Sequence, residues 1–60
     1  MDNWISTKEC LPSKYREVLL IDSIGNMFTG YFLGERFEDS NGYDTLDITH
    51  WQPLPKPPKE

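Results

Sequence analysis

Cysteine is nearly absent from this 60-residue chain, which removes a common support of very small domains. Cys10 is the one cysteine, so no disulfide can form within the chain. With His50 as the one histidine, the four cysteine and histidine ligands of a structural zinc site are also missing. Aromatic side chains must therefore supply most of the buried surface. We expect no metal and no other cofactor.

Basic charge is scarce as well. Ten acidic residues face six basic ones, giving a formal net charge of −4 at pH 7. Nucleic-acid-binding proteins carry a basic surface, so we expect no nucleic-acid partner. No apolar run approaches the roughly 20 residues of a membrane span, and the start of the sequence lacks the basic and apolar regions of a signal peptide. Together with a free thiol, these features predict a cytoplasmic protein that does not bind membranes.

The apolar pattern predicts a mainly β domain with an antiparallel sheet. Residues 17–22 hold four consecutive apolar residues between charged ends, which indicates a strand covered on both faces, or nearly so. Residues 23–26 form a turn, and residues 27–33 form the second strand of a hairpin. Short strands around residues 36–38 and over residues 48–51 complete a three- to four-stranded meander. The whole chain, residues 1–60, is expected to be one small domain.

Polar residues between these strands predict local turns. Ser6-Thr7-Lys8-Glu9 has the spacing of a capping box and predicts one short helical turn, which makes the fold a small α+β one. Residues 39–42, Asp-Ser-Asn-Gly, are typical of a loop. Their glycine stands at the fourth position instead of the sixth of a calcium-binding loop, so a turn is expected there. Gly30, within a strand, predicts a bulge or a site where a tryptophan ring lies on the backbone.

The two tryptophans stand near opposite ends of the chain. Trp4 opens the sequence Trp-Ile-Ser, and Trp51 precedes a proline-rich segment that is expected to be extended polyproline II from residue 52 onward. We predict that Trp4 and Trp51 share one core, so that the N- and C-terminal segments clasp the sheet. Residues 56–60 are expected to fray.

A catalytic site would pair His50 as the base with Cys10 as the nucleophile, or with Asp47 as an orienting acid. Such a site also needs oxyanion donors and a firmly held third group, which the sequence does not supply. Cys10 has no basic cluster beside it in the sequence that would favour a reactive thiolate. We therefore predict a protein that is not an enzyme and has no catalytic residues, in which His50 ties a strand end to a neighbouring loop.

Three segments together resemble a known family. They are Trp4-Ile5-Ser6, the following Leu11-Pro12, and Thr49-His50-Trp51-Gln52-Pro53-Leu54-Pro55. They are similar to the small domain-of-unknown-function family five-five-one, which is common in bacteriophages and prophages. The resemblance implies a phage-type accessory protein and brings no established catalytic residues. The family's usual pattern has a basic residue just before Leu-Pro, where this chain has Cys10. It also has a third strand rich in aromatic residues, where this chain has only Phe37.

The predicted function is therefore that of a small protein-binding module, a phage or prophage accessory protein in the cytoplasm of a bacterial host. Its partner would be a host protein, for example a defence factor that it inhibits or modulates. The alternative is a small-ligand or catalytic site around His50 and the two tryptophans, formed at a dimer interface. A homodimer is expected because a short sheet has open edges and its second strand carries many apolar side chains. The candidate partner-binding residues are Phe28, Tyr31, Phe32, His50 and Trp51.

Overall fold

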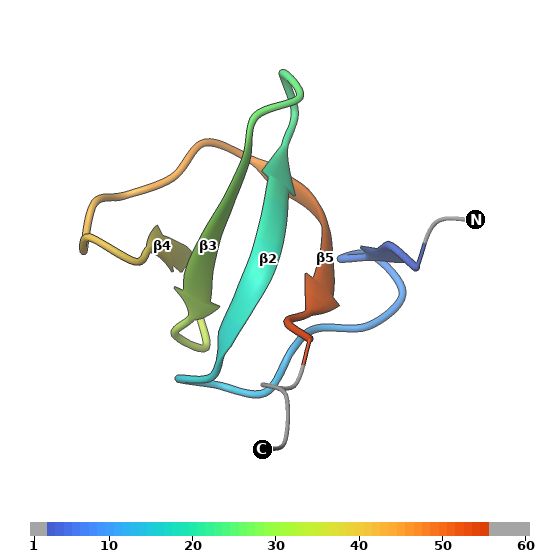
Figure 1. The fold of residues 1–60 in the computed structure, drawn as a ribbon, viewed down its shortest axis with the longest axis horizontal. Coiled ribbons are helices and arrows are strands. Elements are labelled where there is room, and N and C mark those ends of the chain that lie inside the picture. Colours follow the sequence, from blue (N-terminus) through green and yellow to red (C-terminus); the bar gives the residue numbers. More distant parts are fainter. Residues whose placement is uncertain (1–2, 56–60) are drawn as a thin grey trace, which may run out of the picture.

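Residues 3–55, which the computed structural model describes, form one antiparallel sheet of five strands (Figure 1). The strands are β1 (Ile5–Ser6), β2 (Glu17–Asp22), β3 (Met27–Phe32), β4 (Phe37–Asp39) and β5 (Ile48–Pro53). This part of the chain contains no helix, and thus none long and apolar enough to cross a membrane. The expected antiparallel, mainly β fold is confirmed, whereas the expected number of strands was too small.

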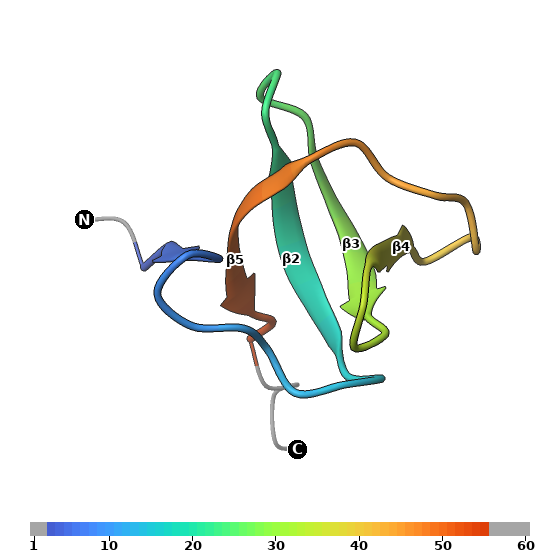
Figure 2. The same ribbon diagram turned by 180° about the vertical axis from the view of Figure 1, so that it is seen from behind.

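The order of strands in the sheet is β1-β5-β2-β3-β4, which is not a meander. Strands β2, β3 and β4 follow one another, but the chain then returns and inserts β5 between β2 and β1. The segment that leads into β5 passes behind β2 in Figure 1 and in front of it in Figure 2. The C-terminal strand is therefore internal to the sheet, and the predicted meander is corrected at this point.

Strand β1 was not predicted from the sequence. It pairs with β5 through Ile5 opposite Trp51 and Ser6 opposite His50. Just beyond it, Thr7 N donates to Thr49 O at 3.0 Å. Two residues are too few to give an alternating apolar pattern, so only the pairing with β5 defines this strand.

The expected helical turn after Ser6 is replaced by a single hydrogen-bonded turn. Glu9 N and Cys10 N both donate to Ser6 O, at 3.0 and 3.1 Å. The capping box does not form, because Ser6 Oγ accepts from Lys8 N at 3.2 Å and not from Glu9 N. Ser6 already belongs to β1, so the chain makes one turn over residues 6–10 and does not continue as a helix.

The core lies on one face of the sheet. Val18 and Leu20 of β2 are fully buried there beside Trp51 of β5. The indole N–H of Trp51 donates to Cys10 O at 2.9 Å and so holds the segment after the first turn over this face. Four partly buried side chains pack around these three: Ile5, Phe28, Phe37 and Ile48.

The predicted clasp of two tryptophans is not present. Trp51 is 8% exposed and belongs to the core, whereas Trp4 is only half-buried and is not among the side chains packed on it. Ile5 packs there in its place. Neighbouring residues of an extended chain point to opposite faces, so Trp4 and Ile5 cannot both face the core. The two ends are joined by the β1–β5 pairing and by the Trp51–Cys10 hydrogen bond.

Gly30 marks neither a bulge nor a tryptophan contact. A Cβ at this position would lie 2.7 Å from Leu20 Cδ1 and still closer to Glu38 O, so the glycine lets β4 approach β3. The register irregularity lies elsewhere, between Ile21 and Asp22 where β2 pairs with β5.

The expected polyproline segment does not begin at residue 52, because Gln52 and Pro53 belong to a strand. Strand β5 continues through Gln52 to Pro53, which pairs with Val18. A proline is tolerated at this position because it ends the strand. Residues 56–60, which were expected to fray, lie outside the described residues.

Both predicted turns are confirmed, and each is organised by an aspartate. Asp39 Oδ1 accepts from the backbone N–H groups of Asn41 and Tyr43, both at 2.9 Å. Asp22, 6% exposed, accepts from Asn26 N at 2.9 Å and Ile24 N at 3.1 Å, and Asn26 Nδ2 lies 3.3 Å from its second oxygen. Burial alone raises the pKa of the Asp22 carboxyl, but these hydrogen bonds outweigh burial and lower the pKa.

Candidate functional site

No hydrogen bond joins Cys10 to His50 in the part of the chain that the structure describes. His50 Nδ1 lies 2.9 Å from Thr49 Oγ1, while Cys10 Sγ donates to Leu11 O at 3.7 Å. His50 therefore contacts a hydroxyl of its own strand and not the loop expected from the sequence. Within residues 3–55, no three carboxylate, cysteine or histidine side chains lie close enough together to hold a metal ion.

The second face of the sheet carries an apolar surface. In β2 the residues alternate, so Leu19 and Ile21 point away from the face that holds Val18 and Leu20. The register brings Thr29 and Gln52 beside Leu19, and Met27 and His50 beside Ile21. Tyr31 extends the surface at the end of β3, opposite Glu17. We call this set the open face: Leu19, Ile21, Met27, Thr29, Tyr31, His50 and Gln52.

The loop before β5 and the segment after β1 lie on the core side of the sheet, whereas Ser40 of the loop after β4 contacts the rim of the open face, where its Oγ lies 2.8 Å from Thr29 Oγ1. In Figure 1, no described loop crosses in front of β2, β3 and β5 on the near side. Leu19 and Ile21 are half-buried and do not belong to the core, and Met27 is 63% exposed. The apolar run of β2 is thus covered on one face only, although its composition predicted cover on both or nearly both.

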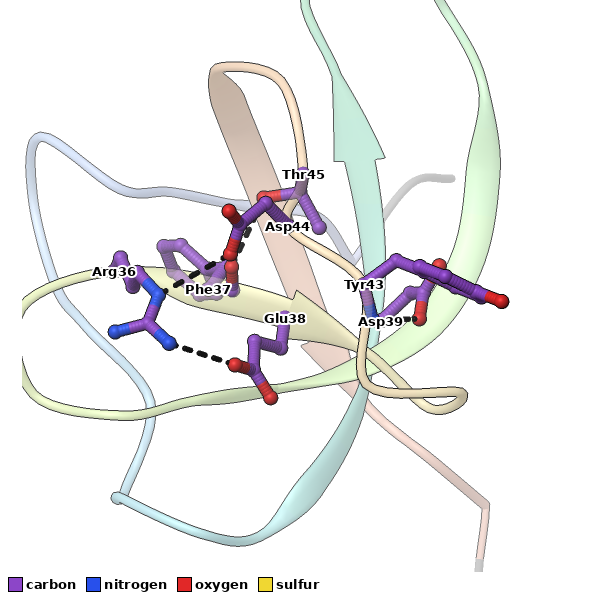
Figure 3. Close-up of polar contacts among 7 residues, drawn as sticks. All are labelled: Arg36, Phe37, Glu38, Asp39, Tyr43, Asp44 and Thr45. Carbon is purple, nitrogen blue, oxygen red and sulfur yellow. Dashed lines mark hydrogen bonds and ion pairs between the residues drawn. The ribbon is translucent and has the colours of Figure 1, made fainter.

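The edges of the sheet offer little room for another strand. Beside β4 the chain folds back: Asp39 N donates to Tyr43 O at 2.9 Å and Thr45 Oγ1 donates to Phe37 O at 3.2 Å (Figure 3). At the other edge, β1 has two residues and ends in a turn. Short and covered edges disfavour strand addition. One reason to expect a dimer, the open edges of a short sheet, is therefore weakened, and the dimer stays a prediction.

The five candidate partner-binding residues are divided between the two faces. Phe32 and Trp51 are buried on the core side, and Phe28 packs against the same core. Tyr31 and His50 belong to the open face. Sequence reasoning missed its apolar members in β2, namely Leu19 and Ile21. The apolar run of residues 18–21 is unbroken, so no polar–apolar alternation in the sequence marks these two residues as belonging to an exposed face.

A groove of about 410 Å³ lies beside β4, where the chain returns toward β5. Apolar side chains of Phe37, Leu46 and Ile48 line it together with carboxylates of Glu35, Asp44 and Asp47. We call it the β4 groove. A second hollow, of about 480 Å³, shares residues 47 and 48 with the β4 groove and is also lined by Ser6, Thr7, Lys8, Thr49 and His50.

Arg36 is the one basic residue of the β4 groove, and its charge is already paired. Its Nη2 lies 2.7 Å from Glu38 Oε2 and its Nε lies 3.4 Å from Asp44 Oδ1 (Figure 3). The hydrogen bond to Glu38, followed by that to Asp44, raises the pKa of the guanidinium further above its ordinary range. Within residues 3–55, no ion pair neutralises the carboxylates of Glu35 and Asp47.

Comparison with known proteins gives one match. A family model described as "Protein of unknown function (DUF551)" matches residues 3–59. No curated protein and no solved structure matches the chain.

Proposed function

Because the chain belongs to the DUF551 family, whose function is unknown, we propose from its geometry that it is a non-enzymatic module that binds another protein through its open face. The observation that carries this proposal is an apolar strip on a face that no described loop covers. Three of its side chains, Leu19, Ile21 and Met27, are neighbours across β2 and β3. A contiguous exposed apolar surface of this kind is typical of a protein-interaction site.

The shape of the open face favours a macromolecular partner. Small ligands are bound in concave sites that enclose most of their surface, whereas the open face is the outer side of a sheet. Polar groups of Thr29, Gln52 and His50 lie among its apolar residues and can hydrogen-bond a partner's backbone or side chains. A large apolar strip with interspersed polar groups fits the centre of a protein interface.

A different protein fits this face better than a second copy of the chain. Each copy carries a net charge of −4, so two copies repel each other. The phage-type resemblance of the sequence supports a protein of a bacterial host as the partner, with inhibition or modulation of that protein as the result. The alternative, a small-ligand or catalytic site around His50 and the two tryptophans at a dimer interface, has less support, because His50 and Trp51 are neighbours in β5 and point to opposite faces.

Substitution on the open face tests the proposal. Ile21→Lys places a charge in the apolar strip, and Ile24→Lys is its matched control because Ile24, 70% exposed, lies in the β2–β3 turn outside the face. The wild-type chain, tagged and crosslinked in a bacterial host, is expected to capture a specific protein. Ile21→Lys should weaken this capture at least about tenfold, as expected for an interface centre, and Ile24→Lys should leave it unchanged.

Circular dichroism of both variants shows whether they remain folded. Equal capture by wild type and a folded Ile21→Lys variant contradicts the proposal. A crosslinked product of two chains that Ile21→Lys abolishes would instead assign the open face to a second copy.

A further inference from the structure

The β4 groove is a second surface, separate from the open face, and it combines an apolar floor with an acidic rim. Phe37 and Ile48 form the floor, and their inner sides pack against the core. Leu46, 59% exposed, adds an apolar side chain that the described part of the chain leaves largely in solvent. The core therefore supports Phe37 and Ile48 from the inside, whereas the outer side of the groove is accessible.

The charge of this region has one dominant sign. Between positions 35 and 47 the chain has five acidic residues and one basic residue, Arg36. The carboxylate of Asp39 is turned inward to its own loop, and Glu38 is paired with Arg36. Glu35, Asp44 and Asp47 line the groove, and Asp44 lies 3.4 Å from Arg36 Nε.

These three carboxylates are not arranged for a metal ion. They belong to no group of three acidic, cysteine or histidine side chains close enough to coordinate one within residues 3–55. Carboxylates spread along an apolar groove suit separate cationic side chains, each of which can meet one carboxylate. A second copy of this acidic chain and a nucleic acid would both bring negative charge to the rim.

We propose that the β4 groove binds a basic peptide segment of a partner protein. One apolar side chain of the segment packs on Phe37, Leu46 and Ile48, and flanking lysine or arginine side chains meet Glu35 and Asp47. A cationic side chain can also compete with Arg36 for Asp44, because that contact is the longer of the two that Arg36 makes, at 3.4 Å. This proposal is independent of the open face, so a partner can be held at either surface or at both.

Short peptides test the proposal directly. The probe is the capped tripeptide Lys-Leu-Arg, and its controls are Glu-Leu-Glu, which reverses the charge, and Lys-Gly-Arg, which removes the apolar side chain. The full chain is labelled with ¹⁵N, and backbone amide shifts are followed during titration to millimolar peptide. We expect Lys-Leu-Arg to shift amides of residues 35–37 and 44–48, and to bind more tightly than either control.

Variants then assign the contacts. Glu35→Gln should weaken binding of Lys-Leu-Arg about two- to fivefold, the range for one partly screened charge pair. Glu9→Gln removes the same charge from an exposed turn outside the groove and should have a smaller effect. Leu46→Ala should weaken binding without unfolding the chain, because this side chain is mostly exposed.

Several results would overturn the proposal. These are equal binding of Glu-Leu-Glu, equal losses from Glu35→Gln and Glu9→Gln, or no shifts in the β4 groove at millimolar peptide. Shifts confined to residues 19, 21 and 27 would overturn it as well, while they would favour the open face as the peptide site.

Discussion

Replacing Gly30 with alanine tests the close approach of β3 and β4. The added Cβ would lie 2.7 Å from Leu20 Cδ1, 3.1 Å from Asp39 Cα and closest of all to Glu38 O. Leu20 is fully buried, and the other two atoms belong to the backbone of β4, which pairs with Gly30 itself. Relief of the collision therefore requires β4 to move away from β3 or Leu20 to leave its place in the core.

The size of the effect follows from this geometry. Overpacking a well-packed site costs about 1–3 kcal/mol and occasionally more. The change from glycine to alanine also raises the free energy of unfolding by about 0.4–1 kcal/mol, because alanine lowers the conformational entropy of the unfolded chain. Because two of the three contacts are with backbone atoms, we expect a net loss near the upper end, about 2–3 kcal/mol. A chain of this length has a free energy of unfolding of about 3–9 kcal/mol, so the melting temperature should fall by roughly 15 °C or more.

Urea and thermal unfolding followed by circular dichroism measure this loss. Gly25→Ala is the matched control, because Gly25 has φ +93° but no atom within 4 Å of the added Cβ. Its strain in the left-handed region should cost about 1–2 kcal/mol. If Gly30→Ala is less destabilising than Gly25→Ala, the close approach of β4 to β3 is wrong.

Three further measurements test other parts of the structure. Trp51→Ala should cost about 3–5 kcal/mol in unfolding free energy and half-buried Trp4→Ala about 1 kcal/mol, so equal losses would restore the two-tryptophan clasp. The pKa of Asp22 is lowered in the folded state, so just below pH 3.8 the folded protein binds fewer protons than the unfolded chain. The ionised Asp22 therefore stabilises the fold above pH 3.8, and this stabilisation is lost as the pH falls through the folded pKa. Asp22→Asn should therefore reduce the loss of unfolding free energy below pH 3.8. The same loss in the variant as in the wild type would contradict the hydrogen bonds of Asp22 in the turn. Sedimentation equilibrium decides the predicted homodimer, since a single species of 7.0 kDa up to millimolar concentration would exclude it.

The candidate site was only partly predictable from the sequence. Tyr31 and His50 were selected because aromatic and titratable side chains are common at interfaces, and both lie on the open face. Phe32 and Trp51 were selected for the same reason, but they are buried. Residue type does not say which face of a strand will be covered. That depends on which side the loops cross, and the loop before β5 is placed by pairing between distant strands.

The sequence by itself determined the local features of this protein. Strand β2 has the predicted bounds, Glu17–Asp22, because its apolar run is enclosed by charged residues. The turns at Asp22 and Asp39 formed where predicted, since a carboxylate and nearby backbone N–H groups need only a few residues to meet. Membership in a family was also readable from the motifs near the two ends.

Only the tertiary structure decided which strands are the neighbours of β5. The insertion of β5 between β1 and β2 joins residues 5 and 51, and residues 18 and 53, which no local pattern relates. Backbone N–H and C=O groups are the same in every strand, so local sequence does not specify the partner that satisfies them. That choice is made by side-chain packing across the whole chain, which places Trp51 on Leu20 and Ile5 and leaves Leu19 and Ile21 on the open face.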